Sequence, residues 1–247
     1  MRPWLELMRV EFKLFIRDVP ATFFVLVFPP MLLLIFGGIY GNQPTPLFGG
    51  FGTVDVSLPA LTALIIATNG LTTLPLGLVT HRERKVLKRL HASPIHPGHL
   101  LLAQFAIMLA TTVVGMLLLG AIAVLVFDLR FRGAWGPSLV AFLVVVASIF
   151  AMGYLLASLA PGTRACTAIA YLLYFPMIFL SGATMPQEIM PDTIRAIATY
   201  LPLTHAVKLL KGVWLGDPLA KHVTELLILG GIAVGSALGA ALTFRWE

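Results

Sequence analysis

Long stretches without a charged side chain constrain this sequence more than any other feature. Six windows contain no Asp, Glu, Lys or Arg: Val19–Val54, Val56–His81, Leu90–Phe127, Gly133–Thr163, Ala165–Gln187 and Leu226–Phe244. A helix of about 20 apolar residues crosses the ~30 Å hydrocarbon core of a membrane. Six such helices use nearly all of the 247 residues. We therefore expect one all-α membrane domain over residues 1–247, without a separate soluble catalytic domain.

The expected membrane spans are residues 20–41, 58–80, 99–127, 137–160, 165–182 and 224–244. Basic residues gather in the leader 1–19 and in the connector after span two, residues 81–98, while the loop after span one has none. Because Lys and Arg near short loops stay on the cytoplasmic side, the leader, the connector and both termini are predicted to be cytoplasmic. The net charge of +6 then fits an anionic lipid surface rather than nucleic acid.

The leader is predicted to form an amphipathic helix in the plane of the membrane interface. Its charged residues recur every three or four positions, and its aromatic residues fall largely on another face. The residues expected to define this interfacial helix are Trp4, Arg9, Phe12, Lys13, Phe15 and Arg17. A solvated helix packed on the bundle is the alternative.

The segment between spans five and six, residues 183–223, is too long for a simple turn. Apolar residues at helical spacing indicate a short helix within Pro191–Tyr200. Thr204 is placed to cap a second helix, which Gly216 would end. We expect two external, re-entrant-like helices that dip partly into the membrane.

Prolines and regularly spaced glycines mark several spans. Proline removes a backbone donor and kinks a helix, and it occurs within spans one, two and five at Pro29, Pro30, Pro59, Pro75 and Pro176. Span six has glycines four residues apart, at Gly231, Gly235 and Gly239. This spacing lets helices in lipid approach closely, and we expect the glycines to pack within the chain.

Motifs for nucleotide binding and hydrolysis are missing from the sequence. It contains no G-x-x-x-x-G-K-[ST] phosphate loop, no H-E-x-x-H pair and no G-x-S-x-G elbow. Histidines cluster at His81, His91, His96 and His99, but they lie among basic residues with only Glu83 as an acidic ligand. We expect no catalytic residue, no metal and no cofactor in this chain. The uncharged spans also disfavour an ion-coupled carrier.

Two groups of residues resemble the permeases of ABC type-two exporters, most of all the daunorubicin-resistance and antibiotic-export group. The first lies in the connector and consists of Glu83, Arg84, Leu87, Leu90, Ser93 and Pro94. The second follows span five and consists of Phe179–Gly182, Met185–Pro186 and Leu201–His205. Their order and spacing extend the resemblance over nearly the whole chain.

The resemblance implies a transporter of two permeases, as a homodimer or a related heterodimer, with two separate subunits that bind ATP and Mg²⁺. It implies that the connector holds a coupling helix that docks on the ATP-binding subunit through Glu83, Arg84, Val86, Leu87, Leu90, Ser93 and Pro94. The leader would complete the docking surface. The pathway would follow spans one, two and five, with Asn69, Thr72, Thr73, Phe175 and Phe179 as expected lining residues.

The predicted function is therefore that of a multi-pass subunit of the bacterial plasma membrane without ATP hydrolysis of its own. It would move an amphipathic drug, antibiotic or lipid-like compound out of the cell. Export of a polysaccharide- or teichoic-acid-type lipid-linked glycan is the alternative within the same architecture. An ion-coupled secondary carrier and an intramembrane lipid enzyme are the alternatives of a different class.

Overall fold

The computed structural model describes residues 2–85, 98–184, 187 and 190–243. Within these ranges six helices are long and apolar enough to cross a membrane: Val19–Tyr40, Thr53–Glu83, Gly98–Phe127, Trp135–Leu159, Thr163–Leu180 and Leu219–Thr243. The prediction of an all-α protein with six spans is confirmed. The predicted coupling residues Val86, Leu87, Leu90, Ser93 and Pro94 lie outside the described residues.

Spans one and two each contain a π-helical stretch just before a proline. Span one consists of α2 (Val19–Thr22), η1 (Phe23–Val27) and α3 (Phe28–Tyr40). Span two consists of α4 (Thr53–Ala67), η3 (Thr68–Thr73) and α5 (Leu74–Glu83). Pro29, Pro30 and Pro75 lie in the helical turns that follow η1 and η3. Because proline donates no backbone hydrogen bond, the preceding carbonyls are free to take the wider π pattern.

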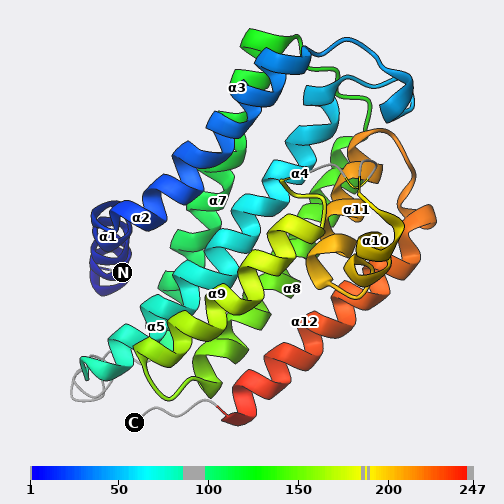
Figure 1. The fold of residues 1–247 in the computed structure, drawn as a ribbon. Helices are drawn as coiled ribbons and strands as arrows, with labels where there is room; N and C mark the ends of the chain where they lie inside the picture. The colour runs from blue at the N-terminus through cyan, green and yellow to red at the C-terminus, as the bar shows by residue number, and fades with distance from the viewer. Residues whose placement is uncertain (1, 86–97, 185–186, 188–189, 244–247) are drawn as a thin grey trace.

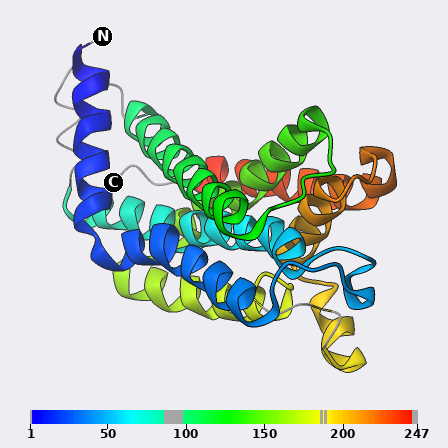
Figure 2. The same cartoon turned by 90° about the horizontal axis from the view of Figure 1, so that it is seen from above.

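Span two is the centre of the bundle. Spans three to six are α7 (Gly98–Phe127), α8 (Trp135–Leu159), α9 (Thr163–Leu180), and η5 (Leu219–His222) with α12 (Val223–Thr243). Figure 2 shows span two in cyan between α3 and α9 on one side and α7, α8 and α12 on the other. Of the residues in its most apolar stretch, 83% are buried, whereas in each of the other spans 50% or fewer are buried. We call the end where α5 ends and α9 begins the inner end (Figure 1) and the opposite end the outer end.

Spans two and four approach each other at two glycines. A Cβ atom on Gly153 would lie 1.9 Å from the backbone oxygen of Gly70. No side chain fits at such a distance, so the two backbones are in direct contact. Small residues allow this contact in lipid, where helices associate through close packing.

The glycines of span six do not all pack within the chain. α12 contacts α8 along its length and buries Ser236 and Ala240. A Cβ on Gly239 would touch a side chain of α8, whereas a Cβ on Gly231 or Gly235 would have no atom of the described residues within 4 Å. The expectation of intrachain packing is wrong for these last two, because the buried face of α12 is centred on other residues.

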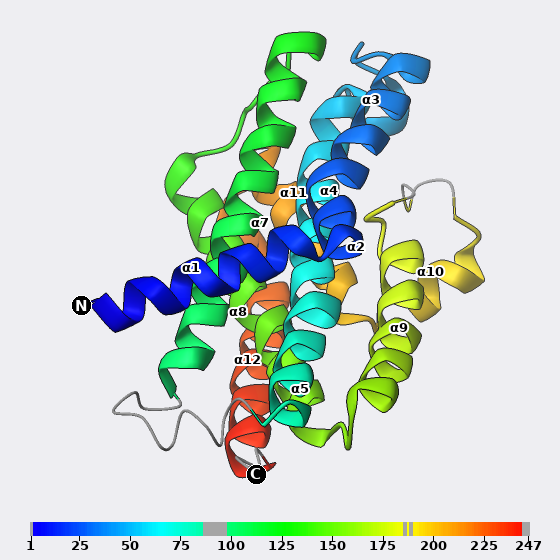
Figure 3. The ribbon, with the colours of Figure 1, turned by 90° about the vertical axis from the view of Figure 1, so that its left-hand side faces the viewer.

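Helix α1 (Arg2–Arg17) lies across the bundle, roughly perpendicular to the spans, and packs on α7 (Figure 3). Of its described side chains only Glu11 and Phe15 are buried. The other predicted interfacial residues with described side chains, Arg9, Phe12, Lys13 and Arg17, are exposed, and Trp4 lies in the first turns of α1. Phe12 and Phe15 therefore do not share one face: Phe15 packs inward and Phe12 points outward.

At the outer end, Asp55 joins span two to two neighbouring turns. Residues 58–80 were the expected span, but α4 begins at Thr53 and buries Asp55 in its first turn. The Asp55 carboxylate accepts hydrogen bonds from the Asn42 amide at 2.9 Å, the Gly52 N–H at 3.2 Å and the Arg130 N–H at 3.0 Å. These donors replace water around the carboxylate, so a charged residue is accommodated inside the helix.

Two short helices, α10 (Asp192–Ala198) and α11 (Pro202–Trp214), lie between spans five and six, beside the outer part of α9 (Figure 1). α11 begins at Pro202, and the Thr204 hydroxyl has no hydrogen-bond partner in the described chain, so Thr204 is not the cap. Gly216 follows the helix with a φ of +106°, as its place at the end requires. α11 packs on α4, α8 and α12, and thus belongs to the bundle.

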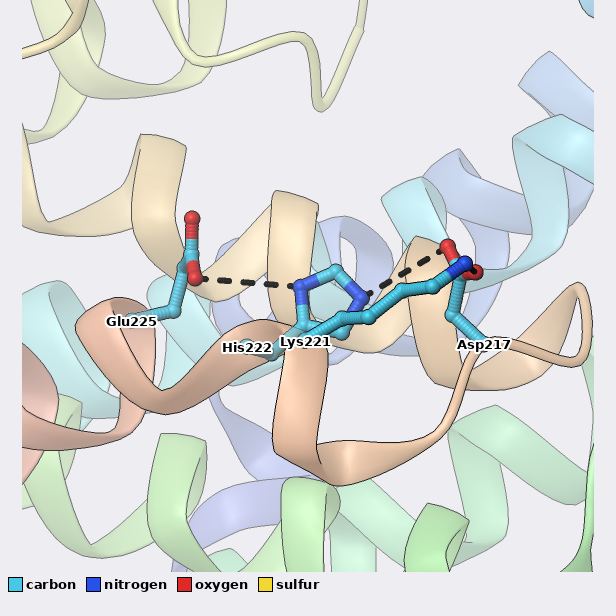
Figure 4. A network of polar contacts seen from close by, with 4 residues as sticks. All are labelled: Asp217, Lys221, His222 and Glu225. Atoms are coloured by element: carbon cyan, nitrogen blue, oxygen red, sulfur yellow. Dashed lines mark hydrogen bonds and ion pairs between the residues drawn. The ribbon is translucent and has the colours of Figure 1, made fainter.

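A polar network joins the segment after α11 to span six (Figure 4). The Lys221 ammonium donates to the Asp217 carboxylate at 2.6 Å. The two ring nitrogens of His222 lie 3.7 Å from oxygens of Asp217 and Glu225. The hydrogen bond from Lys221 holds the pKa of the Asp217 carboxyl below its ordinary value.

Candidate functional site

A cavity of about 650 Å³ opens in the inner half of the bundle, between α1 and spans one, two, three and five. Its volume lies within the range of small-molecule sites. Most of the exposed lining is apolar or aromatic, with threonine, tyrosine and glutamine among it and charged residues at one edge. We call it the inner cavity.

Aromatic rings form one wall of the inner cavity. Tyr171 and Phe175 are four residues apart on α9, so their rings lie on one face and stack with centroids 5.5 Å apart. Phe24 contributes a further ring from the π segment of span one. Such a wall offers flat apolar surface to the body of an amphipathic molecule.

At the deep end of the cavity, one hydrogen bond joins spans two and five, and another lies within span two. The hydroxyls of Thr68 and Tyr174 are 2.9 Å apart. Thr72 donates to the Thr68 carbonyl at 2.6 Å. These residues belong to or face the π segment η3, and π segments are frequent at functional sites. The polar side chains at this level are thus largely engaged with one another.

Gln104 of α7 reaches the same cavity from span three. It is buried, with 2% of its surface exposed, and its carbonyl oxygen Oε1 has no hydrogen-bond partner within the described chain. A Cβ on Gly77 would lie 2.3 Å from the Gln104 amide nitrogen, so the glycine makes room for the amide. Gln104 is therefore a buried polar group with unused hydrogen-bonding capacity at the cavity wall.

Charged residues line the edge of the cavity next to α1. His81 Nε2 lies 3.1 Å from Glu11 Oε1, and both side chains are largely buried. Asp18 caps α2 by accepting from the Ala21 N–H at 3.1 Å. Arg84 at the end of α5 lies at the same edge. The contact between Glu11 and His81 fixes α1 against the inner end of span two.

The last turn of span two is also fastened to the turn between spans four and five. The Arg82 guanidinium donates to the carbonyls of Ala157, at 3.3 Å, and Ala160. The Glu83 carboxylate accepts from the Thr163 N–H at 2.7 Å and from the Thr163 hydroxyl at 2.6 Å. Because Thr163 is the first residue of α9, Glu83 caps span five at its N-terminus. We call Arg82 and Glu83 with these partners the inner clasp.

A second, smaller cavity of about 240 Å³ lies in the outer half, between span one, the start of span two and α11. Lys208 and Lys211 line it together with the neutral polar residues Ser57, Thr184 and Gln187. Along span two, the outer cavity reaches Leu61 and the inner cavity begins at Thr68. The residues between them are buried, so the two cavities are separated by packed side chains.

The predicted pathway residues divide into two groups. Thr72, Thr73 and Phe175 line the inner cavity. Asn69 does not, because it is fully buried and its amide donates to the Thr111 and Thr112 hydroxyls of α7 at 3.2 and 2.8 Å. Phe179 is 57% exposed on α9, outside that cavity.

Some site residues escape the sequence patterns. Glu11 lies on the opposite side of the leader helix from the other charged residues. This isolated position is the one sequence signal that points to Glu11. Tyr174 lies between apolar residues of span five with no polar neighbour in sequence. Its partnership with Thr68 joins residues 106 positions apart, which spacing within one helix does not reveal.

Within the described ranges, no group of three His, Cys, Asp or Glu residues is arranged to hold a metal ion. His91 and His96 lie outside those ranges. His81 faces Glu11 instead of a histidine cluster.

Comparison with known proteins adds a family relationship. Residues 3–215 match the family described as ABC-2 type transporter. The probable doxorubicin resistance ABC transporter permease protein DrrC of Mycobacterium tuberculosis is 26% identical over 233 residues, which cover 93% of this chain and 83% of that protein. Nodulation protein J of Rhizobium leguminosarum bv. viciae is 34% identical over 78 residues, or 32% of this chain and 30% of that protein. The probable multidrug ABC transporter permease YbhR of Escherichia coli is 22% identical over 160 residues, or 65% and 44%.

Proposed function

Because the chain belongs to the ABC-2 type transporter family, we propose that it moves an amphipathic, drug-like or lipid-like compound out of the cell with energy from ATP bound to separate subunits. The family and the six spans make it a multi-pass permease of the bacterial plasma membrane. The proposed assembly contains two permeases, identical or related, and two ATP-binding subunits that hold ATP and Mg²⁺. This chain contributes the pathway and no hydrolytic chemistry.

The inner cavity is the observation that supports this cargo best. It opens beside α1 at the inner end, so a compound dissolved in the cytoplasmic leaflet has a short route into it. Its aromatic wall suits an apolar body, and its charged edge suits a polar group that stays near the membrane surface. A site that is mostly apolar with a few polar groups is typical of small-molecule binding.

The size and character of the cavity favour a small amphipath over a lipid-linked glycan. About 650 Å³ accommodates one drug-sized molecule. A glycan chain needs a long path lined by hydrogen-bonding groups, and Thr68, Thr72 and Tyr174 already bond to one another. The resistance permease named above is similar over most of its length, which supports the same choice.

The inner clasp offers a mechanical route from the ATP-binding subunits to the cavity. We place the docking surface on the connector, residues 81–98, as the resemblance implies. Glu83 stands at the start of this connector and holds the first residue of α9. A movement of the connector would therefore act on span five, whose Tyr171 and Phe175 form the cavity wall.

Reconstituting the permease with its ATP-binding subunits tests the cargo directly. Aromatic amphipaths should raise the ATPase rate of the complex and compete with one another, whereas lipid-linked glycans should leave the rate unchanged. Stimulation by glycans alone would mean that the cargo is a lipid-linked glycan and not a small amphipath. Transport that continues without ATP but follows an ion gradient would indicate a secondary carrier, and chemical conversion of a lipid by the purified chain would indicate an intramembrane enzyme.

A further inference from the structure

We infer that Gln104 is the specificity-determining residue of the inner cavity, and that it favours aromatic amphipaths that carry an N–H or O–H donor over analogues that lack one. The inference rests on the proposed function, because it takes the inner cavity to be the substrate site. It adds a defined chemical feature to the class of cargo.

The position of Gln104 is built around its amide. The side chain comes from α7, is 2% exposed, and lines the inner cavity. On the facing helix α5, only a glycine leaves room for it, because a Cβ on Gly77 would lie 2.3 Å from the amide nitrogen. If this position served apolar packing alone, an aliphatic side chain would fill it without burying a polar group.

The amide oxygen is left without a partner inside the described chain. A buried acceptor without a hydrogen bond is unfavourable, and native proteins retain few of them. Asn69 also has an unpartnered oxygen, but it lines neither of the two cavities described above, and its amide nitrogen bonds to hydroxyls of α7. Of these two buried amides, Gln104 is the one whose side chain lines the inner cavity.

A substrate donor is the group that completes this site. The terminal torsion of a glutamine turns readily, so the oxygen can face a ligand that occupies the cavity. Of the other hydroxyls at this depth, Thr68 pairs with Tyr174, whereas Thr72 and Thr73 donate to the Thr68 backbone carbonyl. When a site is built to hydrogen-bond a substrate donor, an analogue without the donor leaves the buried acceptor unpaired and binds more weakly.

The test uses two xanthene dyes of equal charge, one with secondary amino groups and one fully N-alkylated, so that they differ in their N–H donors. Fluorescence anisotropy with the full-length permease in lipid nanodiscs gives both affinities without an ATP-binding subunit. We expect the wild type to bind the donor-bearing dye about 10-fold more tightly, the difference of one buried hydrogen bond. Gln104→Met should bind both dyes equally, with the affinity of the alkylated dye.

Two further variants control for general effects. Gln43→Met makes the same substitution at an exposed position of the outer loop and should keep the wild-type preference. Gly77→Ala should displace the amide, because the added Cβ would lie 2.3 Å from the amide nitrogen, and should reduce the preference for the donor-bearing dye. Equal affinity of the wild type for the two dyes, a preference that survives in Gln104→Met, or no binding of either dye would overturn the inference. ATP-driven export of other compounds by the same permease, reconstituted in proteoliposomes with its ATP-binding subunits, would show that the proposed function stands without the inference.

Discussion

Glu83, at the end of span two, caps the first residue of span five, with its carboxylate oxygens 2.7 Å from the Thr163 N–H and 2.6 Å from the Thr163 hydroxyl. The contact joins residues 80 positions apart in the sequence. It connects the start of the connector with the helix that carries the aromatic wall of the inner cavity. Glu83, which the sequence predicts to contact a partner subunit, thus makes a contact within the chain. A movement of the partner would be transmitted to span five through this contact.

Glu83→Ala is expected to uncouple ATP hydrolysis from substrate binding without dissociating the ATP-binding subunit. Loss of the cap frees span five from the connector, so the ATP-binding subunit should still co-purify while substrate no longer stimulates ATP hydrolysis. Thr163→Val should reproduce the effect in part, because the backbone N–H of residue 163 remains as a donor. Glu6→Ala, at an exposed position of α1, is the matched control. Normal substrate stimulation of ATP hydrolysis in Glu83→Ala would show that the inner clasp takes no part in coupling.

The Glu11–His81 contact is expected to stabilise the docking of α1 on the bundle. Glu11→Ala leaves the His81 ring in a largely buried place without its partner, which should cost about 1–3 kcal/mol. Thermal unfolding in detergent, with His81→Ala and the double variant completing a double-mutant cycle, measures the coupling. Strictly additive effects of the two single substitutions would mean that the pair contributes nothing.

Gly153→Ala is expected to disrupt the contact between spans two and four. The new methyl group would overlap the Gly70 carbonyl, and overpacking typically costs about 1–3 kcal/mol. Gly120→Ala introduces the same methyl group into α7 at a place where no other atom of the described part of the chain lies within 4 Å. It should leave the melting temperature unchanged or raise it. Equal melting temperatures of the two variants would contradict the close approach of the backbones.

Asp217 is expected to make the stability of the outer end depend slightly on pH. Its pKa is lowered chiefly by the Lys221 hydrogen bond, so its contribution is present above the unfolded-state pKa of about 4 and is lost as the pH falls through the lower folded-state value. The side chain is 42% exposed, which limits the effect to about 0.5 kcal/mol. Melting curves of Asp217→Asn should diverge from wild type at neutral pH and converge in acid; a constant difference would contradict this.

Docking through the connector is expected to depend on its apolar residues Val86, Leu87 and Leu90, which lie among charged residues. Leu87 and Leu90 are three residues apart, so a helix would place them on one face. Leu87→Asp or Leu90→Asp should release the ATP-binding subunit while the permease remains inserted. Lys88→Asp, between them, changes charge without removing apolar surface and serves as the control. Retention of the subunit by both leucine variants would move the docking surface elsewhere.

The number of spans follows from the sequence because it depends on hydrophobic length alone. The exact ends of the spans depend on tertiary partners. Asp55 lies inside α4 because Asn42, Gly52 and Arg130 supply donors from two other turns. Likewise, α11 begins at Pro202 rather than at Thr204, since proline suits the first turn of a helix.

The cavity could be predicted only in part. Thr72, Thr73 and Phe175 line it, as expected for polar and aromatic residues in spans two and five. Asn69 lies next to Thr68 in the same π segment but faces α7 instead, because successive residues of a helix point in different directions. Glu11, Gln104 and Tyr174 were missed as site residues, since their roles come from contacts between distant helices.

The division of labour between permease and partner is tested most directly in proteoliposomes. We expect the purified chain alone to hydrolyse no ATP. Addition of its ATP-binding subunits should produce accumulation of an aromatic amphipathic dye that requires ATP and Mg²⁺. The accumulation should persist when ion gradients are collapsed. ATP hydrolysis by the chain alone, or accumulation that follows an ion gradient and ignores ATP, would contradict the account.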